Sequence, residues 1–169
     1  MIPHDFASVT DQLASVPPFL DEALRSIAVA DWDRHAEGIE FSFRQQLCHL
    51  RDVELEGYLV RVTRMTAEAS PLMVDLNGTE LAQVRHYEIQ DPALAVRDFT
   101  SLRTATVAKL RGLSRDDWSR LGRFAPDSPF NVRELAAMML AHDRQHCDEI
   151  GALVASSASP NFYSAMSSL

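Results

Sequence analysis

The stretch that decides the fold is NVRELAAMMLAHDRQHCDEIGAL, residues 131–153. Asn131 and Glu134 have the spacing of a capping box, in which two side chains satisfy free backbone amides at a helix start. The residues that follow recur at intervals of four, three, four and seven, as expected for one inward face of a helix; they are Leu135, Met139, His142, His146 and Leu153. The sequence therefore predicts a long helix that begins at Asn131 and ends near Ala155.

The first half of the chain contains two more segments with helical periodicity. The first covers residues 6–30 and is interrupted at Pro17-Pro18, because proline cannot donate an interior helix hydrogen bond. The second begins at Ser42, which forms a capping box with Gln45, and runs to about Glu68. The apolar stripe of this second helix is expected to consist of Phe43, Leu47, Leu50, Val53 and Val60.

A further long helix is expected from Asp91-Pro92, an N-cap followed by proline, to Gly112, a residue typical of the position after a helix end. Shorter helical turns are expected at residues 79–87 and 114–121, and strand-like alternation is scarce. Four amphipathic helices with one long connection at residues 69–90 predict an all-α fold. The arrangement expected is a four-helix bundle with this connection between helices two and three.

Length and composition fit one globular domain. The 169 residues are 46% hydrophobic and 24% charged, which is enough to bury a core. We expect a single domain at residues 1–155, followed by a polar C-terminal tail at residues 156–169. The net charge is −8 and basic residues form no cluster, so nucleic acid is not an expected partner.

The expected compartment is the cytoplasm. The N-terminus lacks the basic and apolar regions of a signal peptide, and no apolar stretch approaches the ~18 residues of a membrane span, so no membrane association is expected. The two cysteines, Cys48 and Cys147, do not make a disulfide framework. Each adjoins a histidine, but on a helix adjacent residues point about 100° apart. Both are therefore interpreted as small buried thiols rather than nucleophiles.

The pair His142 and His146 is the main indication of chemistry. Four residues apart on a helix, two imidazoles lie on one face and can bind the same ion at ~2.0–2.1 Å. Such a pair also arises by chance, but two histidines one turn apart in a core are hard to satisfy without a shared partner. His49, near the edge of the apolar stripe of the second helix, is the candidate third ligand. The alternative for His49 is a lone histidine hydrogen-bonded to solvent or to a carboxylate.

Two short motifs resemble those of a known family. The stretch HLRDVE at residues 49–54 and the stretch LAHDRQH at residues 140–146 resemble the helix-two and helix-four motifs of the DinB/YfiT-like superfamily. Order and spacing agree over about residues 11–153. The resemblance implies a four-helix bundle, often a homodimer, with a three-histidine metal site. It therefore implies His49, His142 and His146 as the metal ligands.

Three histidine ligands leave a coordination position open, as in catalytic zinc sites. Zinc is the first expectation, while nickel, manganese and iron also suit imidazole ligands. Asp52, one turn beyond His49, and Asp143, next to His142, are candidates to orient an imidazole by accepting its distal N–H. The alternative is that both carboxylates are solvated on helix surfaces.

The resemblance implies a metal-dependent enzyme that acts on a small-molecule substrate. The activity expected first is thiol S-transfer, with a low-molecular-weight thiol such as bacillithiol or mycothiol as the cosubstrate. Metal-dependent hydrolysis is the close alternative. A non-catalytic bundle that binds metal in a stress response is the other, because no general base is evident. The sequence identifies no catalytic residue beyond the ligands.

Overall fold

Two short helices in line form the first long helix of the fold. The computed structural model describes residues 6–157, with α1 at Phe6–Ala14 and α2 at Val16–Ser26. Pro17 and Pro18 lie in the first turn of α2, where the missing backbone N–H costs no helix hydrogen bond. The predicted interruption at these prolines is a restart of the helix.

The second long helix consists of α3 (Phe43–Asp52), a π-helical turn (Val53–Tyr58) and α4 (Leu59–Ala67). Its predicted capping box is confirmed: the backbone N–H of Ser42 donates to Oε1 of Gln45, and the backbone N–H of Gln45 donates to Oγ of Ser42. The π-helical turn was not expected from the sequence. Such turns insert an extra residue into an α-helix and are frequent at functional sites.

The π-helical turn changes which residues of α4 face the core. The predicted stripe is wrong at Val60, which is 42% exposed. Instead Tyr58, Val62 and Met65 are buried. A regular α-helix from Val53 would bring Val60 inward after seven residues, whereas one inserted residue rotates the following side chains by about 100°.

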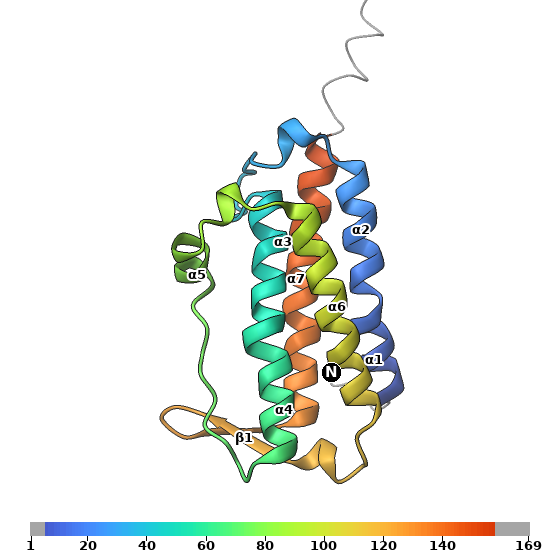
Figure 1. The fold of residues 1–169 in the computed structure, drawn as a ribbon, viewed down its shortest axis with the longest axis vertical. Coiled ribbons are helices and arrows are strands. Elements are labelled where there is room, and N and C mark those ends of the chain that lie inside the picture. The colour runs from blue at the N-terminus through green and yellow to red at the C-terminus, as the bar shows by residue number, and fades with distance from the viewer. Residues whose placement is uncertain (1–5, 158–169) are drawn as a thin grey trace, which may run out of the picture.

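The third long helix, α6 (Pro92–Arg111), begins where predicted, and the side chain of Asp91 accepts a hydrogen bond from the backbone N–H of Ala93. The connection before it contains a short helix, α5 (Gly78–Val84), and a 3₁₀ turn (Tyr87–Ile89), close to the helical turn expected there. Figure 1 shows this connection lying beside α3 and α4 rather than within the bundle.

A small β-hairpin that the sequence analysis did not predict precedes the last helix of this mostly helical fold. Strands β1 (Leu121–Phe124) and β2 (Ser128–Asn131) pair antiparallel. Four residues are too few to give a clear alternation in the sequence. The backbone N–H of Met73 donates to the carbonyl of Arg123 at 2.8 Å, so the hairpin also holds the connection. Only a 3₁₀ turn, Asp117–Ser119, forms in the predicted 114–121 segment.

The last helix, α7 (Val132–Ser157), begins with the predicted capping box. The backbone N–H of Asn131 donates to Glu134, and that of Glu134 donates to the side chain of Asn131. The helix continues two residues past the expected end at Ala155. The rest of the predicted tail, from residue 158, lies outside the described residues.

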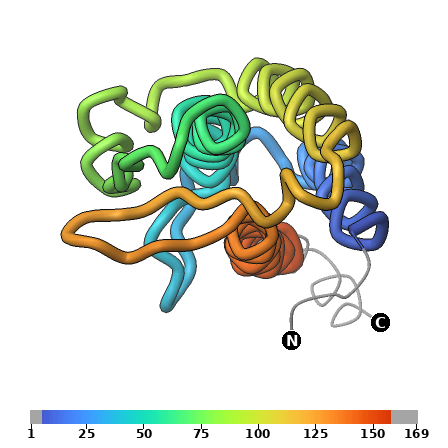
Figure 2. The backbone as a smooth tube through the Cα atoms, turned by 90° about the horizontal axis from the view of Figure 1, so that it is seen from below, coloured from blue at the N-terminus to red at the C-terminus, as the bar shows by residue number. Residues whose placement is uncertain are grey.

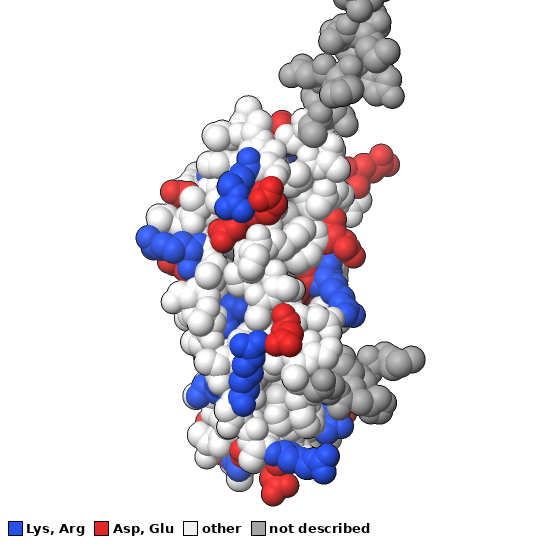
Figure 3. Space-filling view, turned by 90° about the vertical axis from the view of Figure 1, so that its right-hand side faces the viewer, with Lys and Arg blue, Asp and Glu red and all other residues white. Residues whose placement is uncertain are grey.

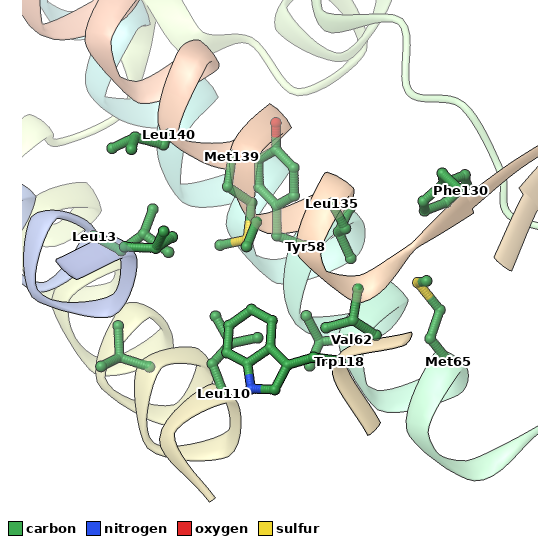
Figure 4. Packing of buried hydrophobic residues seen from close by; sticks show 14 of the residues in the cluster. Leu13, Tyr58, Val62, Met65, Leu110, Trp118, Phe130, Leu135, Met139 and Leu140 are labelled. Carbon is green, nitrogen blue, oxygen red and sulfur yellow. The ribbon is translucent and has the colours of Figure 1, made fainter. Parts of the chain in front are cut away.

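The four long helices lie side by side around a common interior (Figures 1 and 2). This interior contains two apolar clusters and a set of buried polar side chains. One cluster surrounds Leu110, Trp118 and Met139 at the hairpin end (Figure 4). The other surrounds Leu20 and Phe99. The buried polar side chains include Gln46, His49, Asp52, Glu54, Arg103, Asp143 and His146. Buried polar groups are costly unless partnered, so this set is the place to look for a site.

The outer surface shows no gathered patch of one charge on the face drawn in Figure 3, where basic and acidic side chains are interspersed. Several form exposed ion pairs, such as Arg97 with Asp98. Within residues 6–157, no helix has the length and apolar character needed to cross a membrane.

Candidate metal centre

Three imidazoles meet among the buried polar side chains of the interior. His49 comes from α3, and His142 and His146 come from adjacent turns of α7. One ring nitrogen of each lies within 4.8 Å of those of the other two. The Nε2 atoms of His49 and His142 are 3.2 Å apart. The long helices thus bring together the pair predicted from its spacing and the third histidine that the resemblance implied.

Two of these histidines are held neutral by their surroundings. Burial lowers the pKa of His49 to about 3, and the nearby His146 and His142 add to the effect. Burial and the neighbouring His142 lower the pKa of His146 to about 4. At neutral pH both rings therefore have an unprotonated nitrogen, which is the form that binds metal.

The ring geometry fits a divalent ion. Ligand nitrogens at ~2.0–2.1 Å from a tetrahedral metal lie about 3.3 Å from one another, close to the 3.2 Å between His49 and His142. These two Nε2 atoms face each other, while the Nδ1 atoms of both rings are buried with no hydrogen-bond partner among the described residues. A cation between the two rings would bind the Nε2 lone pairs of His49 and His142, which otherwise lie against each other.

His146 is oriented by a residue that the sequence analysis missed. Its Nδ1 donates to Oε1 of Gln46 at 2.6 Å, and Nε2 of Gln46 donates to the carboxylate of Glu149 at 2.6 Å. Because a carboxylate only accepts, the amide of Gln46 must present its oxygen to His146. Nε2 of His146 is therefore unprotonated. Gln46 thus fixes the tautomer of His146 in the way that a hydrogen-bond partner fixes that of a metal-binding histidine. Gln46 lies three residues before His49, so helical spacing offered a signal for it.

Asp52 does not orient His49, contrary to one of the two alternatives from the sequence. Its carboxylate accepts hydrogen bonds from the hydroxyl of Tyr87 at 2.8 Å and from Arg51 at 2.7 Å, and it pairs with Arg85 at 2.8 Å. Nor is it a solvated surface group, since it is 1% exposed. Asp52 instead ties α3 to the connection that follows α5.

Asp143 is also buried, which excludes the surface alternative. Its carboxylate accepts hydrogen bonds from Nη1 and Nη2 of Arg103 at 2.5 and 3.2 Å, and Arg103 also donates to Glu54 at 2.8 Å. The Nδ1 atom of His142 is 3.7 Å from Asp143, which is too long for a hydrogen bond. Asp143 therefore contacts His142 mainly through its charge and belongs to a buried ion triad with Arg103 and Glu54.

Other polar candidates lie outside the cluster. Burial raises the pKa of Cys48 to about 11 and that of Cys147 to about 12, so neither is a thiolate at neutral pH. Both are free thiols; Cys48 is buried as expected, whereas Cys147 is only partly buried. His86 is exposed and pairs with Glu88.

The connection approaches the cluster at Gly78. A Cβ atom at this position would lie 2.5 Å from Cε1 of His49, closer than such atoms approach without one of them moving. We expect Gly78→Ala to displace the His49 imidazole and to weaken metal affinity by about tenfold, similar to the loss of a group that orients a ligand. The measurement is a competition titration with a chromophoric chelator.

Gly151→Ala provides the matched control, because a Cβ atom at Gly151 meets nothing within 4 Å. It removes a glycine from the interior of α7 and should leave metal affinity unchanged. Equal metal affinities for the two variants would contradict the close approach of Gly78 to the metal centre.

The fold and the cluster together define a class of protein: a four-helix bundle whose interior carries three convergent histidines. The sequence profile described as the DinB superfamily matches residues 12–150, and the chain belongs to this family. YfiT from Bacillus subtilis, described as having an unusual four-helix bundle topology, has a similar structure with a TM-score of 0.83. That match covers 90% of this chain and 87% of YfiT at 18% identity. A comparison with curated proteins gives no significant match.

Proposed function

We propose that this protein is a metal-dependent enzyme that acts on a small molecule, with His49, His142 and His146 as the ligands of one divalent ion. The observation that carries the proposal is the convergence of three ring nitrogens within 4.8 Å of one another. Zinc is the first choice among metals that suit imidazole. When bound, such an ion with an open coordination position lowers the pKa of a thiol or water that it coordinates.

The residues around the cluster favour thiol transfer as the reaction. The ion would activate water as it would a thiol, but hydrolysis usually also depends on a carboxylate or histidine that moves a proton to the leaving group. The nearby carboxylates already form hydrogen bonds or ion pairs. Asp52 pairs with Tyr87 and two arginines. Glu54 and Asp143 both pair with Arg103, and Glu149 accepts a hydrogen bond from Gln46. A low-molecular-weight thiol whose pKa is lowered becomes a nucleophile without such a base. We therefore propose S-transfer from a thiol to an electrophilic small molecule.

Hydrolysis is the second candidate, and one specific observation favours it. YfiT, which shares the fold, is described as a probable metal-dependent hydrolase. The side chain of His142 is 23% exposed, so a small molecule can reach this side of the cluster in either reaction.

The two candidates are separated by assaying zinc-loaded, tag-free protein with two substrates. Monochlorobimane is supplied with cysteine, glutathione, bacillithiol or mycothiol in turn, and fluorescence reports conjugation above the protein-free rate. p-Nitrophenyl acetate reports hydrolysis. We expect conjugation with at least one thiol that disappears on metal removal and in His142→Ala. Ester hydrolysis with the same dependence, and no conjugation, would favour the hydrolase. Bound metal with neither activity would contradict both and indicate a non-catalytic bundle.

A further inference from the structure

Arg61 differs from the other buried arginine of the described chain. Arg61 is 8% exposed and Arg103 is 1% exposed. Arg103 has carboxylate oxygens of Glu54 and Asp143 within 2.8 Å. The nearest carboxylate to Arg61 is that of Asp75, which is 3.9 Å away and has a 94% exposed side chain. A buried cation without a close counter-charge is energetically unfavourable, so an anion bound next to Arg61 would be stabilising.

The hydrogen bonds of Arg61 are also incomplete. Its Nη2 donates to the carbonyl of Val74 at 2.8 Å. Its Nε is buried without a partner among residues 6–157, as is Nε of Arg103, and its Nη1, which is not fully buried, makes no hydrogen bond to these residues. A guanidinium offers five N–H donors in a rigid plane, and most of those of Arg61 are unused. Donors left without acceptors in a buried position indicate a missing ligand.

An aromatic side chain joins Arg61 to the histidine cluster. The guanidinium carbon of Arg61 lies 5.8 Å from the ring centre of Tyr58. The Tyr58 ring in turn stands edge-on to His142, with ring centres 5.6 Å apart. In Figure 4 the Tyr58 ring lies beside Met139 of α7, with its hydroxyl directed away from Trp118. Tyr58 therefore lies next to both Arg61 and His142.

The π-helical turn places the side chains of Tyr58 and Arg61 next to each other in the interior. Because it ends at Tyr58, it rotates Tyr58 and Arg61 toward the interior and leaves Val60 outside. The connection completes the surroundings, since the carbonyl of Val74 holds one edge of the guanidinium. The ring of Phe124, in β1, lies 5.0 Å from the guanidinium carbon.

We propose that Arg61 and Tyr58 bind a carboxylate group of the small molecule whose other end reaches the three-histidine cluster. This inference rests on the proposed function of that cluster. The unpaired N–H groups of Arg61 donate to the carboxylate, and the hydroxyl of Tyr58 adds a further donor. The substrate or cosubstrate thiol is thus an anionic molecule, bound at one end by charge and at the other by the metal.

The test compares two thiols with the same two-carbon spacer and opposite charge, 3-mercaptopropionate and cysteamine. Calorimetric titration into cobalt-loaded protein gives both dissociation constants, and the thiolate-to-cobalt absorption band reports contact with the metal. Because charge-assisted hydrogen bonds are strong, we expect wild type to prefer the carboxylate by about tenfold. Arg61→Met should abolish the preference, Arg61→Lys should keep part of it, and Tyr58→Phe should reduce it.

Arg64→Met is the matched control, because Arg64 lies one turn further along α4 and already pairs with Glu68 at the surface. It should keep the full preference, and retained cobalt binding shows that each variant is folded. A wild type without carboxylate preference, or an unchanged preference in Arg61→Met, would overturn the proposal.

The outcomes also distinguish this inference from the proposed function. An Arg61-dependent carboxylate preference without the absorption band supports the carboxylate site and contradicts thiol binding at the metal. If wild type binds no cobalt, the proposed metal function fails, and the same titrations are made on metal-free protein. There, a preference lost in Arg61→Met supports the carboxylate site, and its absence overturns it.

Discussion

Replacing Arg103 with methionine is expected to destabilise the protein by about 3–5 kcal/mol, the cost of breaking a buried ion pair by removing one partner. The substitution leaves the carboxylates of Glu54 and Asp143, which are at most 1% exposed, without their shared counter-charge. Chemical denaturation at neutral pH measures the free energy of unfolding. Arg97→Met on the same helix, whose side chain is exposed beside Asp98, is the control and should change it by less than about 0.5 kcal/mol.

The destabilisation should depend on pH in a defined direction. Burial alone would raise the pKa of Asp143, but its contacts with His142 and Arg103 hold it below the usual 3.8. A carboxylate with a lowered folded-state pKa stabilises the protein above the pKa of the unfolded state, and this contribution disappears as the pH falls through the folded-state value. The stability of wild type should therefore fall below about pH 4. The difference between wild type and Arg103→Met should shrink as the pH falls from neutral, because Asp143, left buried without Arg103, takes up a proton more readily in the variant. A difference that is small at pH 7, or that grows in acid, would show that the triad does not stabilise the fold in this way.

Replacing Gln46 with leucine is expected to weaken metal affinity by about 10- to 100-fold, the usual effect of removing an outer partner of a ligand. The amide of Gln46 is the group that accepts the Nδ1 proton of His146. Without it, the ring loses the hydrogen bond that sets its tautomer and orientation. A competition titration with a chromophoric chelator measures the change.

Gln145→Leu is the control for Gln46→Leu, because Gln145 donates to the same Glu149 carboxylate from the exposed face of α7. Its metal affinity should match that of wild type. If Gln46→Leu also binds metal as wild type does, the orienting role of Gln46 is wrong.

The parts of the fold that depend on local chemistry could be predicted from the sequence. Ser42, Asp91 and Asn131 begin helices because their side chains bind backbone amides a few residues away, and all three starts are confirmed. The π-helical turn and the hairpin could not be predicted. The π-helical turn packs against α6, which is distant in the sequence. The strands of the hairpin are adjacent in the sequence but have only four residues each, too few for a clear alternation.

The candidate site also has parts that could be predicted from the sequence and parts that could not. The spacing of His142 and His146 could be interpreted directly, whereas His49 needed the family resemblance because its partners are on another helix. Asp52 was misplaced because Tyr87 and Arg85, more than thirty residues away, occupy its carboxylate. The positions of Tyr58 and Arg61 follow from the π-helical turn. The homodimer implied by the resemblance stays a prediction.

The most direct test of the metal centre is the metal content of the tag-free protein, measured by elemental analysis after purification and dialysis. We expect one divalent ion per chain in wild type and in His35→Ala, which changes an exposed histidine. In His142→Ala we expect a large loss of bound metal. Full occupancy in His142→Ala would contradict the three-histidine centre.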